Sequence, residues 1–354
     1  MKKLYHLLVT SNKLRVTNLF CRISDIGYRI SFIAFCFLPA AAFAQNEATI
    51  TNLDFSCPGI VTVTYDLDVS RCVNVTLEYS SENCGWMPAL GAEGDLTSQT
   101  TGDGKTITWD AAAHNVSFGK FYYKVTYPSA PSCVELNGVT VNGLCWAKTN
   151  LDVGGVFCTN PWDYGALYQW GRRPDGHERR TPNPPYLSGP VPDSNLDGNG
   201  QPTGSYTGAF ITNSGTGNWR SQCDTLWNYG SEICPIKSFN DPCPDGWRVP
   251  VLDEFNNLIT TIINGSGSLA TYTGVAGRWF GDGGVSSLFL PAAGYRWFTS
   301  GSVLNAGTIG RYYTSTPFTA GSTSRLLYFE SGSYTMSMNS SLSAGSSVRC
   351  VAEQ

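Results

Sequence analysis

The stretch Cys243-Pro-Asp-Gly-Trp-Arg-Val-Pro-Val-Leu-Asp-Glu-Phe-Asn-Asn-Leu258 sets the organisation of the C-terminal half of this chain. It opens as a turn, because Pro fixes φ and Gly tolerates a positive φ. Apolar residues recur at helical spacing from Leu252 onward, and Asp253 and Glu254 fall in the first turn, where the helix dipole favours anions. The stretch therefore predicts an amphipathic helix that is entered through a cysteine-bearing turn.

A second cysteine lies near the other end of this half. Cys350 belongs to a short strand-like run, Ser347-Val-Arg-Cys-Val351. A disulfide between Cys243 and Cys350 would tie the start of the helix to the last strand. Closing so long a loop contributes roughly 3 to 5 kcal/mol of stability in the chain-entropy model. We therefore expect a covalently closed domain.

Several motifs, in this order, resemble a known family. They are Gly143-Leu-Cys-Trp-Ala-Lys-Thr-Asn150, Tyr164-Gly-Ala-Leu-Tyr-Gln-Trp-Gly171, the Cys243 stretch, Ala293-Gly-Tyr-Arg296, Gly310-Arg-Tyr-Tyr-Thr-Ser-Thr316 and Ser347-Val-Arg-Cys350. Residues 138–354 together resemble the Fibrobacter succinogenes major paralogous domain. The resemblance implies an α+β domain with a C-type-lectin-like fold and long loops. It implies no chemistry, because such folds host both binders and enzymes.

The N-terminal residues 1–44 have the pattern of a secretory signal peptide. Basic residues precede an apolar run from Ile30 to Phe43, and the small residues before Gln45 suit cleavage there. No later apolar run approaches the ~18 to 20 residues that a membrane helix needs. We expect an exported protein, secreted or held at the cell surface, with no transmembrane segment in the mature chain.

The charge balance argues against one class of partner. The whole chain carries a formal net charge of −4, and loss of residues 1–44, with their excess of basic residues, makes the mature chain more acidic. A general nucleic-acid binder is expected to be basic. We therefore expect no nucleic-acid partner.

The cysteine count agrees with export. The chain has 12 cysteines, and those beyond residue 44 are even in number and widely spread, as expected of disulfides in an oxidising compartment. We expect pairing within an N-terminal group of Cys57, Cys72, Cys84 and Cys133, and within a C-terminal group of Cys145, Cys158, Cys223, Cys234, Cys243 and Cys350. Cys223 and Cys234 are close enough for a local staple. The connectivity otherwise stays open.

Residues 45–134 read as an all-β domain. Segments 61–67, 73–79, 106–109 and 121–127 alternate apolar and polar residues, are rich in β-branched side chains, and are separated by Gly, Asp and Ser. Short strands at this spacing predict a β-sandwich of fibronectin-III or immunoglobulin type. We expect this domain to act as a spacer, with an independent binding site as the alternative.

An aromatic cluster follows the start of the second domain. It consists of Trp162, Tyr164, Leu167, Tyr168 and Trp170. Large aromatic side chains at this density usually form a buried core. We expect them to lie beneath the long loops.

The long aperiodic segment 171–242 contains a candidate calcium loop. Asp193, Asn195 and Asp197, with the backbone carbonyl of Asn199, would supply about half of the six to eight oxygen ligands that calcium needs. Gly204 stands where an EF-hand carries its bidentate Glu, so other ligands would have to come from elsewhere. The alternative is a solvated Asp/Asn turn. Calcium is the one cofactor that the sequence suggests.

The same segment opens with a basic run, Arg172-Arg-Pro-Asp-Gly-His-Glu-Arg-Arg180. It predicts either a solvated loop with internal ion pairs or a patch for an acidic ligand such as a sulfated or uronic-acid glycan. Arg suits the second alternative, because its planar guanidinium forms a fork for anions.

Enzymatic chemistry finds little support in the sequence. Trp247-Arg-Val-Pro-Val-Leu-Asp-Glu-Phe255 is similar to a motif of formylglycine-generating enzymes, which hold copper with a close pair of cysteines, but Cys350 has no near neighbour in the sequence. His114 and His177 are the only histidines after residue 44, and no nucleophile or zinc-ligand spacing occurs. Paired carboxylates for glycoside hydrolysis stay open, because their pairing is spatial. We expect no enzyme.

A candidate ligand-binding face lies between residues 293 and 347. Aromatic and Arg side chains set among small polar residues are typical of adaptable binding surfaces. The candidates are Tyr295, Arg296, Trp297, Arg311, Tyr312, Tyr313, Arg325, Tyr328 and Tyr334. The alternative is that these residues alternate along strands and pack a sheet. The resemblance agrees with a ligand face here, because the segment before the last cysteine carries it in C-type-lectin-like folds.

The sequence thus predicts a recognition or adhesion protein that binds a glycan or a protein on a host or bacterial surface. The calcium-dependent sugar-binding triplets of animal lectins are absent from the chain. A structural subunit of a fimbria or extracellular matrix is the main alternative, and an enzyme of the formylglycine-generating type is a further one.

Overall fold

The computed structural model describes residues 8–10, 13–15, 45–56, 59–69, 72–81, 86–114, 116, 121–128, 132–221, 226–263, 265, 267–319 and 323–353. The chain forms two compact units, residues 1–130 and residues 131–353. Of the predicted signal peptide, only the paired strands β1 (Leu8–Thr10) and β2 (Lys13–Arg15) are described. The rest of that prediction lies outside the described residues.

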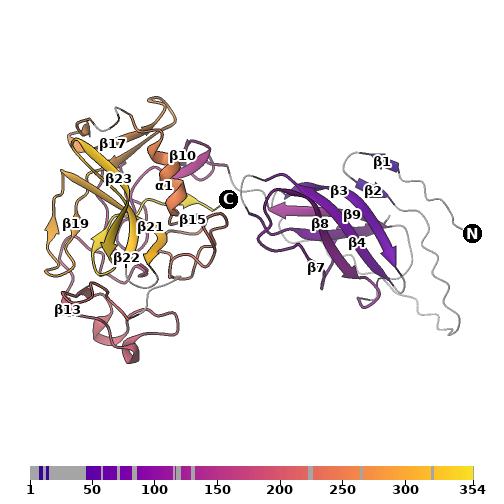
Figure 1. Ribbon diagram of the computed structural model, residues 1–354, viewed down its shortest axis with the longest axis horizontal. Coiled ribbons are helices and arrows are strands. Elements are labelled where there is room, and N and C mark those ends of the chain that lie inside the picture. The colour runs from indigo at the N-terminus through magenta and orange to yellow at the C-terminus, as the bar shows by residue number, and fades with distance from the viewer. Residues whose placement is uncertain are drawn as a thin grey trace, which may run out of the picture. The chain divides into compact units, whose positions relative to one another are not determined.

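Unit 1 is built from paired antiparallel strands (Figure 1). Its further strands are β3 (Gln45–Ser56), β4 (Ile60–Leu67), β5 (Thr76–Ser81), β6 (Met87–Pro88), β7 (Glu93–Gly94), β8 (Gly102–Asp110) and β9 (Phe121–Pro128). The long strand β3 pairs with β9 through its first residues and with β4 through the remainder, so it joins two sheet halves. The predicted strands are confirmed, although β5 begins three residues later than the pattern predicted, and the sheets are sandwich-like.

The core of unit 1 follows from strand alternation. Along β4, alternate side chains are buried, among them Val61 and Val63, which lie opposite Trp109 and Ile107 of β8. The Trp109 indole N–H donates to the carbonyl oxygen of Leu90 at 2.9 Å. A period of two places one face of each strand in the core, which is why the sequence pattern was sufficient here.

Unit 2 is also mostly β-structure (Figure 1). Its strands are β10 (Gly138–Val141), β11 (Leu144–Ala147), β12 (Tyr168–Gln169), β13 (Tyr186–Ser188), β14 (Phe210–Thr212), β15 (Trp247–Arg248), β16 (Ala270–Tyr272), β17 (Val275–Gly281), β18 (Ser287–Pro291), β19 (Tyr295–Arg296), β20 (Val303–Leu304), β21 (Ile309–Thr319), β22 (Thr323–Glu330), β23 (Ser333–Ser341), β24 (Gly345–Ser346) and β25 (Val351–Ala352). Short 3-10 turns occupy Asp193–Asn195 and Gly204–Tyr206. The longest pairings are in the antiparallel meander β21-β22-β23.

The predicted α+β class is wrong. In the described part of the chain the only α-helix is α1 (Leu252–Ile259), and the fold is β-rich. The helix itself is where the sequence predicted it, but it has only 8 residues. The Gly-, Ser- and Thr-rich remainder of the unit has no second segment of helical periodicity and forms short strands. The finer assignment to a C-type-lectin-like fold stays a prediction.

The turn before α1 is fixed by a buried ion pair. Arg248 and Glu254 form two parallel hydrogen bonds, with Nη1 to Oε2 at 2.8 Å and Nη2 to Oε1 at 2.6 Å. The Glu254 carboxylate also accepts the backbone N–H of Val251 at 3.0 Å, at the first turn of the helix. Two residues of the quoted stretch therefore stabilise the turn, and their role is structural.

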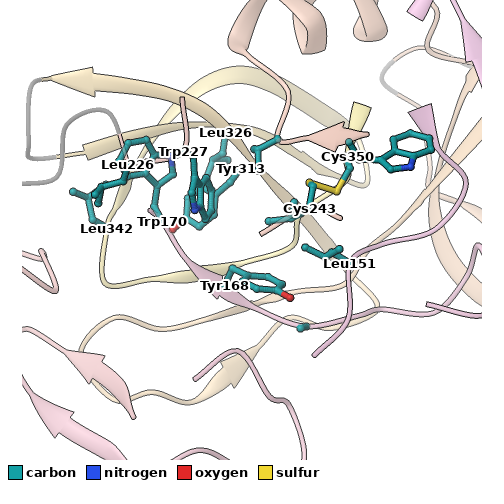
Figure 2. Close-up of a cluster of buried hydrophobic side chains, with 14 of the residues drawn as sticks. Leu151, Tyr168, Trp170, Leu226, Trp227, Cys243, Tyr313, Leu326, Leu342 and Cys350 are labelled. Carbon is teal, nitrogen blue, oxygen red and sulfur yellow. A yellow bond between two sulfur atoms is a disulfide. The ribbon is translucent and has the colours of Figure 1, made fainter. Parts of the chain in front are cut away.

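The predicted disulfide between Cys243 and Cys350 is present, with the two Cα atoms 6.1 Å apart. It lies in a buried cluster with Trp170, Trp227 and Tyr313 (Figure 2). Strand β25, which follows Cys350, pairs with β11 on one side and with β15 on the other. The C-terminal end of the chain is therefore held in unit 2 both by the disulfide and by strand pairing.

One predicted grouping of cysteines is wrong. Cys145 is bonded to Cys133, and Cys158 is buried and free. The hairpin β10–β11 returns Cys145 to the residues just before β10, and a Cβ at Gly138 would lie 2.4 Å from the Cys145 sulfur. Cys133 thus belongs to unit 2. Cys72 and Cys234 are disulfide-bonded, while Cys57, Cys84 and Cys223 lie outside the described residues.

Within the described part of the chain, no helix has the length and apolar character needed to cross a membrane.

Candidate functional site

A pocket of about 310 Å³ opens in unit 2 where two sheets meet. It is lined by residues from β19, β21, β22 and β23 and from the segments next to them. These are Tyr295, Trp297, Phe298, Ile309, Arg311, Tyr328, Ser340, Ser341 and Ala344. A concave site with apolar and aromatic walls and a few polar groups is the usual form of a small-ligand site, and this volume is at the lower end of the ~300 to 1,000 Å³ range.

The pocket contains a buried cation, Arg311 of β21. The residue is only 7% exposed, and its guanidinium carbon lies 4.4 Å from the centroid of the Tyr295 ring. Nη2 donates to the Ser340 hydroxyl at 2.6 Å, and Nε has no acceptor among the described residues. Burial lowers the pKa of Arg311, since the charged form loses solvation.

Aromatic side chains form the wall beside Arg311. The Trp297 ring lies 6.0 Å from Tyr295 and 4.7 Å from Phe298, centroid to centroid. Trp297 is 36% exposed, so one part of the indole remains accessible from solvent. A ligand can therefore contact an aromatic surface that is already held in place by its neighbours.

The loop between β19 and β20 positions Trp297. Its backbone N–H donates to the carbonyl of Ser302 at 2.9 Å, and the N–H of Gly301 donates back to the Trp297 carbonyl at 2.8 Å. Gly301 adopts a φ of +71°, and a Cβ there would lie 2.6 Å from the Tyr186 ring. Only glycine fits this close approach without strain.

On the β22 side, Tyr328 is also held by a neighbour. Its hydroxyl donates to a carboxylate oxygen of Glu330 at 2.8 Å. Burial and this hydrogen bond raise the pKa of Tyr328 to about 12, so the phenol is neutral at physiological pH. The pocket thus offers one cation and neutral hydroxyl groups.

The structure brings together four residues of the predicted binding face. Tyr295, Trp297, Arg311 and Tyr328 line the pocket. Arg325 and Tyr334 are half-buried on β22 and β23 and are not part of its lining.

Three other predicted face residues are fully buried: Arg296, Tyr312 and Tyr313. Arg296 follows Tyr295 in β19 and therefore points to the opposite side, where it donates to the carbonyl oxygens of Arg179 and Gly301. These residues pack the interior, as the alternative interpretation of this segment predicted.

The two buried tyrosines satisfy their hydroxyl groups inside the protein. The Tyr312 hydroxyl donates to the carbonyl of Pro291 at 2.7 Å, and that of Tyr313 donates to the carbonyl of Ala344 at 3.0 Å. Tyr313 also packs edge-on against Trp227 in the cluster of Figure 2. Their assignment to a ligand face was wrong.

Sequence reasoning missed the smaller pocket residues. Ile309, Ser340, Ser341 and Ala344 line the pocket, but serine and alanine are common throughout this segment. The pattern contained no signal that separates them from their neighbours, because their role depends on which strands meet.

The candidate calcium loop is closed by protein donors. Asp197 accepts the backbone N–H groups of Asn199 and Gln201 on one oxygen and pairs with Arg173 at 2.9 Å through the other. The Asn199 carbonyl accepts an amide hydrogen of Asn240.

The remaining predicted calcium ligands lie in the 3-10 turn just before Asp197. An Asp193 oxygen accepts the Ser221 hydroxyl, and Asn195 accepts that of Ser194. Calcium at this loop stays a prediction, and its binding would require displacement of Arg173.

The basic run 172–180 is not a continuous anion-binding surface. Arg172 is buried and pairs with Asp175 at 2.5 Å, and Arg173 pairs with Asp197. Arg180 donates to the carbonyl of Ala293. The predicted internal ion pairs are present, but the loop is not solvated as predicted, because Arg172, His177 and Glu178 are fully buried.

Three side chains in this run could in principle hold a metal ion: Asp175, His177 and Glu178, whose ligand atoms lie within 4.8 Å of one another. The backbone N–H of Gln169 donates to His177 Nε2 at 3.0 Å, so Nδ1 carries the proton and donates to Asp175 at 2.6 Å.

Glu178 is also engaged, since it accepts the backbone N–H groups of Gly154 and Gly176. The three ligand groups therefore already have partners, and the cluster fixes the loop.

The sequence and the structure were compared with known protein families, curated proteins and solved structures. No protein-family model matches this sequence, and neither a curated protein nor a solved structure is significantly similar to it. The geometry defines the class of protein. The chain is β-rich, its second unit is closed by a disulfide, and this unit has a pocket lined by aromatic residues and a buried arginine. The family resemblance stays a prediction.

Proposed function

We propose that this protein is an exported recognition protein that binds a glycan of a cell surface in the pocket around Arg311. The observation that carries the proposal is the lining itself: four aromatic side chains, Tyr295, Trp297, Phe298 and Tyr328, line the pocket together with a buried guanidinium. Sugar rings have an apolar C–H face and a polar edge. An aromatic wall beside hydrogen-bond donors is complementary to both.

The polar chemistry of the lining supports binding rather than turnover. The residues that line the pocket include no His, Cys, Asp or Glu. The nearby carboxylate of Glu330 is already engaged by Tyr328. General acid or base catalysis needs a titratable group within reach of the reacting atoms, and the lining supplies only an arginine and neutral hydroxyls.

The rest of the architecture is consistent with display of a binding site. The Cys243–Cys350 disulfide and its surrounding cluster support the unit from which the pocket opens. Unit 1, with its separate core, suits the role of a spacer between this unit and the surface that holds it. A protein ligand is the alternative occupant, since Tyr and Arg are also frequent in protein-binding surfaces.

The test is a glycan array followed by isothermal titration with the sugars that bind. Trp297→Ala should weaken binding about tenfold or more, which corresponds to about 1.4 kcal/mol. Tyr229→Ala is the matched control, because Tyr229 is an aromatic residue that is 54% exposed outside the pocket. Equal affinity of the two variants would place the ligand elsewhere. Filaments in the purified native protein would favour a structural subunit instead.

A further inference from the structure

We infer that the Arg311 pocket selects sugars that carry a carboxylate, such as uronic or sialic acids, and that the carboxylate pairs with the Arg311 guanidinium. This inference rests on the proposed function, because it names the chemical class of ligand for the same site. It is carried by the charge of the pocket, which has a cation without a counter-ion.

The counter-ion is missing among all described residues. Arg311 forms no ion pair there, and the groups that interact electrostatically with it are Tyr313, Tyr295 and Tyr328. Within the same part of the chain, its one side-chain hydrogen bond goes to the hydroxyl of Ser340. A buried charge normally has a partner of opposite sign, because desolvation is costly without one. A ligand anion would provide this partner.

A second buried arginine strengthens the positive field. Arg296, the residue next to Tyr295, donates to two carbonyl oxygens and to the Tyr186 hydroxyl at 2.8 Å. No carboxylate accepts from it among the described residues. The chain as a whole is acidic, with a net charge of −4. Arg296 therefore adds a second positive charge in the strand that lines the pocket, on a chain that is acidic as a whole, and this favours an anion.

The aromatic lining alone would also suit a cationic ligand, since rings attract cations. Arg311 decides between the two. Its guanidinium already covers the Tyr295 ring at 4.4 Å, and a second cation in the same pocket would be repelled. An anionic ligand is attracted by the charge of Arg311 and can still pack against the Trp297 ring.

A carboxylate fits better than a more highly charged group. A guanidinium is planar, stays protonated at neutral pH, and matches the two oxygens of a carboxylate. One lining cation balances one negative charge, and the pocket volume of about 310 Å³ suits a unit the size of one sugar ring. Sulfated sugars, with the same charge but a tetrahedral group, are the comparison that the experiment includes.

The experiment titrates the intact chain with matched sugars. Methyl glucuronoside is compared with its methyl ester, which has nearly the same shape without the charge, and with a sulfated glucoside. Galacturonic and sialic acids are tested with their esters in the same way. We expect the acid to bind at least about tenfold more tightly than its ester, and higher salt to weaken only the acid.

Two variants assign the effect to Arg311. Arg311→Gln should remove the difference between acid and ester. Arg220→Gln should keep it, because Arg220 also stacks near a tryptophan, 5.8 Å from the Trp219 ring, but does not line the pocket. Trp297→Ala should weaken acid and ester together. Thermal unfolding of each variant shows whether it folds.

The outcomes separate the two proposals. Equal binding of acid and ester to the unmodified protein overturns the carboxylate inference and leaves glycan binding intact, and it does so even if Arg311→Gln does not fold. Binding of none of the sugars overturns both proposals. Tighter binding of the sulfated sugar than of the uronic acid overturns the choice of carboxylate.

Discussion

Two of the arginines that unit 2 buries, Arg248 and Arg311, have different surroundings. In the turn before α1, Arg248 meets the carboxylate of Glu254 through two hydrogen bonds, and the Cys243–Cys350 disulfide lies near the same turn. In the pocket, Arg311 meets a tyrosine ring and a serine hydroxyl. The charge of Arg248 is paired within the protein, whereas Arg311 has no carboxylate partner among the described residues, and we propose that a ligand provides one.

Arg278 and Arg349 also lack a carboxylate partner among the described residues, but they donate to carbonyl and amide oxygens inside the protein. Arg311 differs from them because it lines a pocket.

If the turn before α1 and its disulfide hold unit 2 closed, loss of the disulfide should have the largest effect on the free energy of unfolding. Replacement of both Cys243 and Cys350 by Ala should cost about 4 to 5 kcal/mol, since the bridge closes a long loop with a sequence separation of 107. The Cys133–Cys145 bridge, with a separation of 12, is the control and should cost about 3 kcal/mol. Urea unfolding measures both. A smaller loss of unfolding free energy for the Cys243–Cys350 bridge than for the Cys133–Cys145 bridge would contradict this expectation.

The ion pair between Arg248 and Glu254 should contribute nearly as much to the free energy of unfolding. Glu254→Gln should lower the free energy of unfolding by about 3 to 5 kcal/mol, because it leaves the buried Arg248 without its counter-charge. Asp253→Asn, on the same helix but exposed, should change it by less than about 0.5 kcal/mol. Denaturant titration of the two variants makes the comparison, and similar small effects would mean that the pair is dispensable.

His177 is a buried group that burial keeps in its neutral form. Burial lowers the pKa of His177 in the folded state, whereas the unfolded histidine titrates near 6.5. Below that pH the unfolded chain binds more protons, so stability falls as the pH decreases, by up to about 1.4 kcal/mol per pH unit.

The contribution of His177 is isolated by difference. Unfolding of the unmodified protein and of His177→Gln is measured between pH 7 and pH 5. The unmodified protein should lose more stability over this range than the variant does. Parallel curves would show that His177 is not held neutral.

The smallest effect on stability should come from Arg311. Arg311→Gln should change the free energy of unfolding by less than about 1.5 kcal/mol, because the loss of one hydrogen bond is offset by removal of an unpaired buried charge. Arg248→Gln should cost at least twice as much. Equal losses in unfolding experiments would show that the two regions do not differ as described.

The sequence predicted local features well where they depend on neighbouring residues. The periodicity after Leu252 indicated α1, and the alternation in residues 61–67 indicated β4. The Cys243–Cys350 bridge could be expected because one cysteine lies in the turn before the helix and the other in the last strand-like run. The fold class could not, since the α+β class was implied by the family resemblance, whereas the residues around the one helix form short strands.

The site was only partly predictable for a related reason. Alternation along β19 and β21 shows that neighbouring side chains point in opposite directions, but not which side a second sheet covers. Tyr295 and Arg296 therefore looked equivalent, although only Tyr295 lines the pocket. The pairing of Cys133 was missed because an even count of cysteines on each side of a boundary is compatible with several connectivities.

A crystal structure of the protein with its tightest-binding uronic or sialic acid would settle what the pocket does. The account predicts that the sugar ring lies against Trp297 and that a carboxylate oxygen lies within hydrogen-bonding distance of the Arg311 guanidinium. A sugar bound at another place, or one bound in the pocket with its carboxylate turned away from Arg311, would contradict it.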